Sequence, residues 1–504
     1  MEALLSTFKK FVYGIGRFGS SLLLTVTDLT VFYIYGALFE LSWLLSGIAL
    51  SLSYVVIGLT HWLTGYISDQ VDTGLGRRKP FVIFGAPGLA IATFMLFIPN
   101  WFMNTSDSTI ELLVFGYYTL FICLTKFFYA FLLTAFQAWM PEITDENDRP
   151  IVSSLQNTSN WIGTGLGIAM GILAVYLFAV GPPAGLSELG TSLLLAFCII
   201  EVLFFIPSII WIREGPDIVI PTRSLVNETM VALRNRDYVG WMLSISFLSF
   251  AFTAITAQII GFAQNVLLLD SIDKLLLPAL ALVISIMVFL YIWIIAINRL
   301  GKGRSLILSM VILAIMLIDL PFLAQLSHYV SPIAIGIVIF IPMAACMAVY
   351  YLLSYIVTAD IAHVDELKTG QNRAGIYEGF KGVPFNFSQA LSALLLGIIM
   401  DYSFHATGSN VFGLTWWAPI FAPFLLLGAL LLNYIDIDPD FESLKTIAVL
   451  KKPVKKKKKA TKKKKETATK TTKKKTSKKS EIEPEEKEIA VASSKKRTRK
   501  KKTT

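Results

Sequence analysis

Long, uninterrupted apolar stretches recur along this chain and constrain its fold more than any other feature of the sequence. We count twelve of them, at roughly 17–40, 43–68, 81–103, 109–140, 151–180, 189–213, 238–268, 275–299, 305–327, 330–361, 373–401 and 413–436. A helix needs about 20 apolar residues to cross a bilayer, and every stretch meets that length. The stretches do not alternate as the strands of a membrane β-barrel would. The sequence therefore predicts an all-α membrane protein with 12 transmembrane helices.

The composition excludes a soluble enzyme. Charged residues make up 16% of the 504 residues, whereas a soluble chain carries about 25%. The three Cys and four His are scattered without paired spacing, so neither a disulfide framework nor a metal site is predicted. We expect no cofactor.

Basic residues are unevenly divided between alternate loops. With the N-terminus inside, the inner loops carry thirteen of them: Arg77, Arg78, Lys79, Arg149, Arg213, Arg223, Arg234, Arg236, Arg299, Lys302, Arg304, Lys368 and Arg373. The outer loops carry Lys274 alone. The positive-inside rule therefore predicts a cell-membrane protein with both termini in the cytoplasm. Lys9, Lys10 and Arg17 precede the first span, which we expect to act as an uncleaved anchor.

The longest connection divides the chain into two halves of six spans. We predict an N-terminal bundle over 1–213, a cytoplasmic loop over 214–237, a C-terminal bundle over 238–437 and a disordered tail over 438–504. A faint repeat supports the halves: LGRRK at 75–79 follows span two, and LGKGR at 300–304 follows span eight. Many secondary transporters are built from two such repeats, with the site at their interface.

The net charge of +10 arises from the C-terminal tail. Residues 451–504 hold 25 Lys and Arg against 6 Glu, whereas residues 1–450 hold 20 Lys and Arg against 29 Asp and Glu. The tail lacks aromatic residues, so it cannot bury a core. It is expected to bind anionic lipid or an acidic partner, at about 1 kcal/mol per basic residue, or else to be a solvated tail that aids solubility. Specific nucleic-acid binding is not predicted.

Four segments resemble one family of membrane proteins. They are YGIGRFGSS at 13–21, GYISDQVDTGLGRRKPF at 65–81, MPEITDENDR at 140–149 and ADIAHVDELKTGQNRAG at 359–375. The second resembles the loop motif of the major facilitator superfamily. The set is more similar to the glycoside–pentoside–hexuronide:cation symporters and the plant sucrose carriers. The resemblance implies a monomeric transporter with two six-helix pseudo-repeats, and not an enzyme.

The loop motifs are candidates for a conformational gate. Carboxylates and guanidinium groups at helix ends can pair in one conformation and separate in another. The alternative is that these charges only anchor the loops and enforce topology. The gating candidates are Asp69, Gly76, Arg77, Arg78, Asp360 and Arg373.

Two ionisable residues lie at similar depths in the first and fourth spans. Asp28 is about 11 residues into its span, and Lys126 is near the middle of its own. The resemblance implies that both helices line a central cavity, so we predict a buried Asp28–Lys126 pair. Because intramembrane charges are costly, the pair is a candidate for binding a polar solute or exchanging a proton. A purely structural ion pair is the alternative.

Other ionisable residues of the spans are weaker candidates. His61, with an intrinsic pKa of about 6.5, is a proton carrier or a neutral hydrogen-bonded side chain. Glu378 and Lys381 are three residues apart, so they share a helical face and can pair. Glu201 is as well explained by a local hydrogen bond.

Amide side chains complete the candidate site. Amides can hydrogen-bond the hydroxyl groups of a solute, although they also join neighbouring helices. The candidates are Gln137, Gln156, Asn157, Asn160, Gln258, Gln264 and Asn386. By contrast, Gly163, Gly167 and Gly171 repeat every fourth residue and predict a close-packing face.

The resemblance is incomplete at the site. Melibiose-type carriers have acidic residues at positions that align with Ser21, Ile57, His61 and Leu133, and basic residues where this chain has Asn157 and Asn386. Sodium coupling is therefore disfavoured. The sucrose carriers have an Arg where this chain has Gln137.

We predict a secondary transporter that moves a sugar or glycoside by alternating access, with a proton as the coupling ion. An organic acid, nucleoside or peptide is the alternative solute, and Lys126 and Lys381 would suit an anion. A non-transporting membrane sensor of the same fold also remains open.

Overall fold

A computed structural model describes residues 6–71, 73–103, 108–144, 149–179, 185–212, 225–269, 271–327, 329–369 and 374–439. They belong to one compact unit, residues 1–441. Arg373 and residues 440–504 of the predicted tail lie outside the described residues.

The described residues are almost wholly helical. The α-helices are α1 (Thr7–Ile15), α2 (Arg17–Tyr33), α3 (Trp43–Gln70), α4 (Lys79–Leu96), α5 (Glu111–Ile143), α6 (Arg149–Leu177), α7 (Glu188–Trp211), α8 (Leu225–Leu233), α9 (Arg236–Asn265), α10 (Ile272–Leu300), α11 (Lys302–Leu326), α12 (Pro332–Thr369), α13 (Ala374–Thr407) and α14 (Val411–Leu432). A π-helical turn, Ile34–Leu38, continues α2. Strands β1 (Phe178–Ala179) and β2 (Gly185–Leu186) pair antiparallel.

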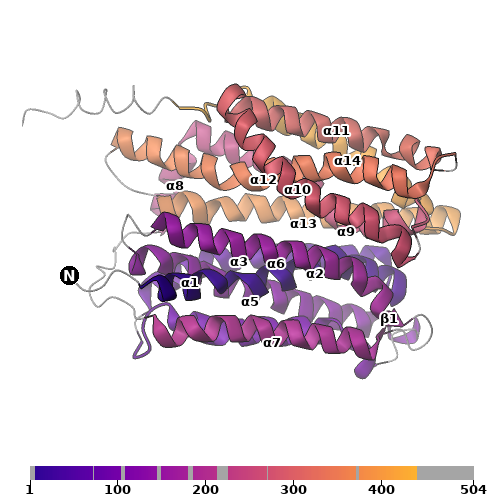
Figure 1. The fold of residues 1–504 in the computed structure, drawn as a ribbon, viewed down its shortest axis with the longest axis horizontal. Coiled ribbons are helices and arrows are strands. Elements are labelled where there is room, and N and C mark those ends of the chain that lie inside the picture. The colour runs from indigo at the N-terminus through magenta and orange to yellow at the C-terminus, as the bar shows by residue number, and fades with distance from the viewer. Residues whose placement is uncertain are drawn as a thin grey trace, which may run out of the picture. The chain divides into compact units, whose positions relative to one another are not determined.

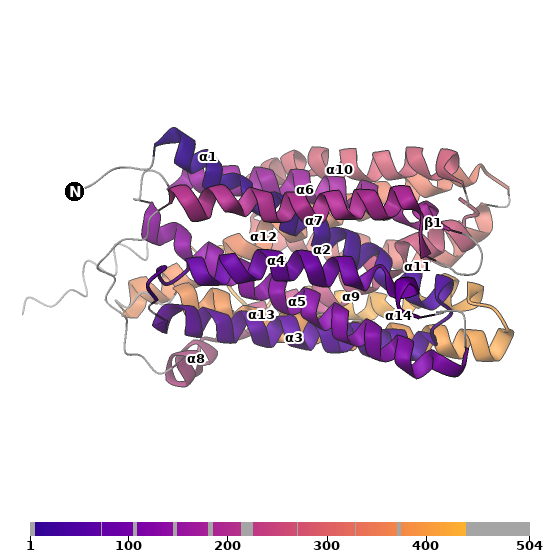
Figure 2. The same cartoon turned by 90° about the horizontal axis from the view of Figure 1, so that it is seen from below.

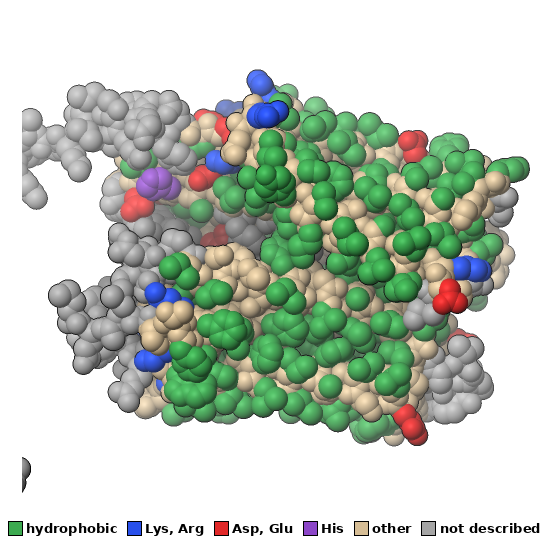
Figure 3. Space-filling model, in the orientation of Figure 1, with side chains coloured by type: hydrophobic (Ala, Val, Ile, Leu, Met, Phe, Trp, Pro, Cys, Tyr) green, Lys and Arg blue, Asp and Glu red, His purple; other side chains and the backbone are tan. Residues whose placement is uncertain are grey.

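Within the described residues, eleven helical segments are long and apolar enough to cross a membrane. Helix α6 is not among them, although its 29 residues span the unit beside the others (Figures 1 and 2). We attribute the difference to its many polar side chains. With α6 as the twelfth span, the prediction of an all-α membrane protein is confirmed. Figure 3 shows the corresponding surface, with hydrophobic side chains across the middle and charged side chains near the two ends.

The helix ends differ locally from the apolar stretches of the sequence. Helix α4 stops at Leu96 rather than near 103, and Pro99 begins a short 3-10 turn. Proline lacks an N–H and cannot continue the helical hydrogen bonding. Helix α12 continues to Thr369, past the predicted end at 361. Helix α8 forms in the loop between the halves, where no helix was predicted.

Figure 1 shows α1 to α7 on one side of this unit and α8 to α14 on the other. Helices α3 and α13 pack against each other across the boundary, as do α2 and α9. We call the end of the unit that carries α1 and α8 the α1 end, and the opposite end the β1 end. Each of four helices extends from the α1 end to the β1 end: α3, α5, α9 and α13.

The repeated loop sequence has a structural counterpart. Gly76 and Gly301 have φ angles of 110° and 86°, which side chains with a Cβ rarely adopt. Each precedes the start of a helix, α4 or α11, at the α1 end. The two positions therefore need glycine for the same reason, and this agreement supports the internal repeat.

Candidate functional site

A cavity of about 1010 Å³ lies between the two sets of helices. Its lining comes from α2, α3, α5, α6, α9, α10, α12 and α13. Along α6 it extends from Ser153 to Ile172, a distance of about 28 Å at 1.5 Å per residue. Figure 3 shows the surface hollowed between the two sets of helices near the α1 end.

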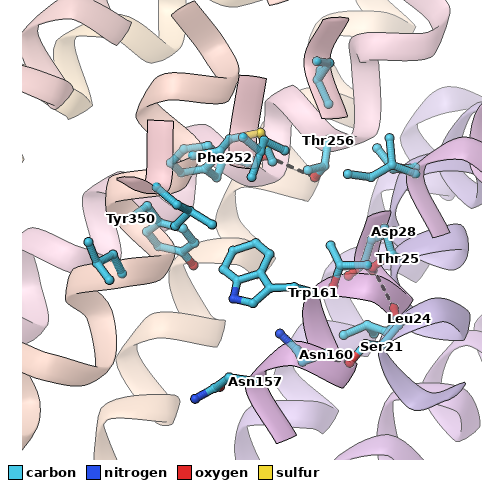
Figure 4. Close-up of a pocket in the computed structure, with 18 of the residues that line it drawn as sticks. Ser21, Leu24, Thr25, Asp28, Asn157, Asn160, Trp161, Phe252, Thr256 and Tyr350 are labelled. Atoms are coloured by element: carbon cyan, nitrogen blue, oxygen red, sulfur yellow. Dashed lines mark hydrogen bonds between the residues drawn. The ribbon is translucent and has the colours of Figure 1, made fainter. Parts of the chain in front are cut away.

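Helices α2 and α6 form a polar wall of this cavity. Their polar side chains recur every three or four residues, which places them on one helical face. They are Arg17, Ser21, Thr25 and Asp28 on α2, and Ser153, Asn157, Asn160 and Thr164 on α6. Figure 4 shows Ser21, Thr25, Asp28, Asn157 and Asn160 on this side of the cavity.

Hydrogen bonds fix part of the polar wall. Ser21 Oγ donates to Asn160 Oδ1 at 2.6 Å, and Thr25 Oγ1 donates to the Ser21 carbonyl oxygen at 2.7 Å. Gln156 also lines the cavity and is 3% exposed, yet its Nε2 has no hydrogen-bond partner in the part of the chain that the structure describes. A buried polar atom without a partner is costly. Gln156 therefore holds an unused donor directly behind the cavity surface.

Close packing of α6 on α2 holds the wall together. The prediction of a glycine face is confirmed: a Cβ on Gly163, Gly167 or Gly171 would press against α2. At Gly167 it would come within 2.7 Å of Thr25 Cβ and 2.9 Å of the Leu22 carbonyl oxygen. The absence of side chains lets the two polar stripes lie next to each other.

The predicted Asp28–Lys126 ion pair is present. Lys126 Nζ donates to Asp28 Oδ1, and it lies 4.7 Å from the centre of the Tyr54 ring. The side chain of Lys126 is 1% exposed and that of Asp28 is 24% exposed. Asp28 and Tyr54 line the cavity, whereas Lys126 does not. The carboxylate therefore lies between a buried cation and the cavity.

The opposite wall, from α9, α10 and α12, is largely apolar. Helix α10 contributes the aliphatic residues Leu275, Ala279, Leu282, Ile286, Leu290 and Ile294. Phe252 and Tyr350 add aromatic rings, and Figure 4 shows Trp161 of α6 in the space between Tyr350 and α2.

Contacts between the two sets of helices close the β1 end. Asn265 Nδ2 donates to the Tyr33 hydroxyl at 3.2 Å, and the Tyr176 hydroxyl donates to the Leu269 carbonyl oxygen at 3.1 Å. Ser42 Oγ donates to Asp401 Oδ1 at 3.1 Å. The cavity ends just short of these bonds.

The structure brings five of the predicted solute-site residues to the cavity. They are Asp28, Gln137, Gln156, Asn157 and Asn160. The others lie outside its lining: His61, Lys126, Gln258, Gln264, Glu378, Lys381 and Asn386. Gln258 is fully buried in α9, and neither atom of its amide has a hydrogen-bond partner among the described residues.

Several of these outlying residues have local partners. Lys381 Nζ donates to Glu378 Oε1 at 2.7 Å and to the Ser354 carbonyl oxygen at 3.1 Å, so that predicted pair is present. Asn386 Nδ2 donates to the Gly382 carbonyl oxygen at 2.7 Å. Glu201 accepts a hydrogen bond from Ser20 at 2.7 Å, on a different face of α2 from the cavity stripe.

His61 has a defined hydrogen-bond role. Its Nδ1 lies 2.7 Å from Thr134 Oγ1, whose hydroxyl donates to the Ala130 carbonyl oxygen at 2.7 Å. A hydroxyl group has a single proton to donate, so we infer that His61 Nδ1 carries a proton and donates to Thr134. This contact agrees with the hydrogen-bonded alternative for His61.

The predicted gating residues form parts of two loops at the α1 end. Asp69 lies in the last turn of α3, and Gly76 N–H donates to the Thr73 carbonyl oxygen at 2.8 Å. Buried Arg78 donates to Ser68 Oγ at 2.5 Å. Arg77 is partly exposed in the same loop.

The second-half loop is held by two carboxylates. Lys302 Nζ donates to Asp360 Oδ2 at 2.6 Å. Asp438 accepts from the backbone N–H groups of Lys302 and Gly303 at 2.8 and 2.9 Å. Anionic groups stabilise a helix N-terminus such as that of α11.

Sequence analysis missed part of the polar wall. Arg17 was assigned to the flank of the first span, but it lines the cavity, as do Ser21 and Thr25. A helical spacing of polar residues within an apolar span was the available signal.

In the part of the chain that the structure describes, no three His, Cys, Asp or Glu side chains gather closely enough to hold a metal ion.

Comparisons with known proteins agree with this architecture. A sequence profile of the family described as "MFS/sugar transport protein" matches residues 5–437. The solved structure of a D-xylose-proton symporter superposes with a TM-score of 0.63 at 13% identity, covering 86% of this chain and 98% of that one. The nucleoside transporter NupG superposes with a TM-score of 0.57 at 14% identity, covering 84% and 98%. At such identities the likeness shows the fold. No curated protein matches the chain by sequence.

Proposed function

The chain belongs to the MFS/sugar transport protein family, and from this premise we propose that it moves a sugar or glycoside by alternating access with proton coupling. The family and the fold are those of secondary transporters of small solutes, and the protein is an integral multi-pass membrane protein. The solute class, the coupling ion, the cell membrane and the cytoplasmic termini belong to the proposal.

The observation that carries the proposal is the position of Asp28 between the cavity and Lys126. When Asp28 is ionised, it pairs with the buried ammonium group. A proton that enters from the cavity would neutralise the carboxylate and weaken this pair. The protonated carboxyl group could then donate a hydrogen bond to a solute hydroxyl. Protonation and solute binding would thus bias the same conformational equilibrium.

The second step is the exchange of access between the two ends. The present conformation has its cavity toward the α1 end, and hydrogen bonds such as Tyr33–Asn265 close the β1 end. Positive-inside bias makes the α1 end cytoplasmic. We propose that residues 1–213 rock against residues 238–437, breaking these bonds and opening the β1 end. Among the gating candidates, Arg78 and Asp360 of α12 would stabilise the α1 end when it closes.

Anion transport has less support than sugar transport. Lys126 and Lys381 were the residues that suited an anion, but neither lines the cavity and each pairs with a carboxylate. Arg17 does line the cavity, but at its α1 end, about 16 Å along α2 from Asp28.

We also propose that the tail at 451–504 binds anionic lipid or an acidic partner. The transporter is proposed to act as a monomer.

Proteoliposome uptake tests the proposal. Purified protein is reconstituted with an inside-alkaline pH gradient, and radiolabelled sugars are offered from outside. We expect uptake above equilibrium in the wild type. Asp28→Asn should retain solute exchange between equal concentrations but lose accumulation. Asp319→Asn, an exposed carboxylate on α11 away from the cavity, is the matched control.

Three other outcomes would contradict the proposed role of Asp28 or the proposed transport function. Normal accumulation by Asp28→Asn would refute its coupling role. A chemically altered solute would indicate an enzyme, and binding without flux would indicate a sensor.

A further inference from the structure

The two walls of the cavity differ in chemistry, and we infer from this difference that the solute is an uncharged amphipathic molecule, with a hydroxyl-rich head and an aliphatic or aryl group attached to it. This inference rests on the proposed function and narrows its solute class. The head would face α2 and α6, and the apolar group would lie along α10.

The apolar wall has the shape of a continuous strip. Leu275, Ala279, Leu282, Ile286 and Leu290 follow one another at spacings of three or four residues, so they lie on one face of α10. The strip spans 16 residues, Leu275 to Leu290, whose ends are about 23 Å apart along the helix. A small, wholly polar sugar would leave most of this apolar surface uncovered.

The hydroxyl groups on this wall are largely occupied. Thr253 Oγ1 donates to the Ser249 carbonyl oxygen at 3.0 Å, and Thr256 Oγ1 donates to the Phe252 carbonyl oxygen at 3.1 Å. Each hydroxyl proton is thus used within α9. Both residues offer the cavity acceptor lone pairs and methyl groups, so this wall suits apolar atoms better than a ring of hydroxyl groups.

The polar wall has the complementary property. Among the described residues, Gln156 Nε2 is buried directly behind the cavity surface without a partner, and exposed Asn157 donates a long hydrogen bond to Ser153 Oγ at 3.5 Å. These amides, with the Asp28 carboxylate, can bind hydroxyl groups that approach from the cavity. The Lys126 ammonium balances the charge of Asp28, so the middle of this wall favours an uncharged head. Arg17, the basic residue of the lining, is 11 residues from Asp28 on α2, or about 16 Å nearer the α1 end.

The cavity volume agrees with a two-part solute. Pockets for drug-sized ligands have volumes of about 300–1,000 Å³, and this cavity, at about 1010 Å³, is at the upper limit. A monosaccharide at the polar wall would leave the α10 strip uncovered. An alkyl or aryl glycoside would reach both walls.

A chain-length series tests the inference. Methyl, butyl and hexyl β-D-glucosides and β-D-galactosides are titrated, below their micellar concentrations, against the full-length protein in nanodiscs. Each methylene that reaches the strip should tighten binding about fourfold, from the usual gain on burying a CH₂ group. Empty nanodiscs and hexanol control for partition into lipid. Hexanol binding as tightly as the hexyl glycosides would overturn the inference.

Variants of α10 locate the effect. Leu282→Asn, on the strip, should reduce the gain from methyl to hexyl by about tenfold. Leu280→Asn is the matched control, because Leu280 is on the same helix but 48% exposed. Leu282→Trp keeps the wall apolar and fills it, so it should weaken hexyl more than methyl glycoside binding.

The outcomes separate the two proposals. Equal binding of short and long glycosides would overturn the amphipathic solute and leave the sugar transporter standing. If no member of either series bound, the sugar proposal would fail, and this inference with it.

Discussion

The two walls of the cavity are built by different physical means. On α2 and α6, glycine contacts bring the helices close and side-chain hydrogen bonds such as Ser21–Asn160 fix polar groups in place. On α10, aliphatic side chains form a surface that needs no particular partner. An unpaired polar group within a bilayer is costly, whereas an apolar one is not. The comparison suggests that the first half of the chain supplies specificity and the second half supplies space.

The largest expected effect comes from the ion pair behind the polar wall. Lys126→Met should leave the Asp28 carboxylate, 24% exposed at the cavity, without its partner and lower the free energy of unfolding by about 3 kcal/mol, the lower end of the range for buried pairs. Thermal unfolding in nanodiscs measures it. The double variant Asp28→Asn/Lys126→Met should recover most of the stability.

Lys381→Met is the control for this prediction. Its partner Glu378 has a side chain that is 45% exposed and remains solvated after the change, so the loss should be less than half as large. Equal losses would contradict the assignment of Lys126 to a buried, dependent pair.

The next effect tests the packing that assembles the polar wall. Gly167→Leu would overlap Thr25 and Leu22 on α2, and overpacking of this kind costs about 1–3 kcal/mol. Solute affinity should fall as well, because the α2 and α6 stripes separate. Gly116→Leu on α5, where a Cβ would meet nothing within 4 Å, should change neither quantity. Similar melting temperatures for the two variants would show that the α2–α6 contact is not needed.

A smaller effect is expected from a single amide of the wall. Asn160→Ala removes one of the two acceptors near the Ser21 hydroxyl, the other being the Arg17 carbonyl oxygen. It also removes a proposed solute contact, and loss of one such bond is worth about 1 kcal/mol. Solute affinity should fall about fivefold in a binding titration. Asn433→Ala, an exposed amide that bonds within α14, should bind as the wild type does. Unchanged affinity in Asn160→Ala would move the solute head away from α6.

The smallest effect concerns the closure between the two halves. Tyr33→Phe removes the hydroxyl that accepts from Asn265 at the β1 end. The equilibrium should shift by about 0.5–1.5 kcal/mol toward opening of that end. Spin-label distances across the β1 end would report longer separations. Tyr329→Phe, 89% exposed near the same end, should leave the distances unchanged, and an equal response in both variants would contradict the proposed lock.

Much of the architecture could be predicted from apolar length and charge placement. These properties act locally, because each span must satisfy its own backbone within the bilayer. Residue depth also follows from position along a helix, which is why the Asp28–Lys126 pair could be predicted. Gln258 and Arg17 mark the limit of this approach. Gln258 is buried away from the cavity, and Arg17, placed on a flank, lines it.

The sequence by itself determined the number of spans, their lengths and the bias of their orientation, since the bilayer imposes these on each segment separately. Only the tertiary structure decided which face of each helix meets the cavity. The rotation of a helix about its axis depends on its neighbours, such as α2 against the glycines of α6, and hydropathy carries little information about it. The contrast between a polar and an apolar wall therefore emerged only when the helices were packed together.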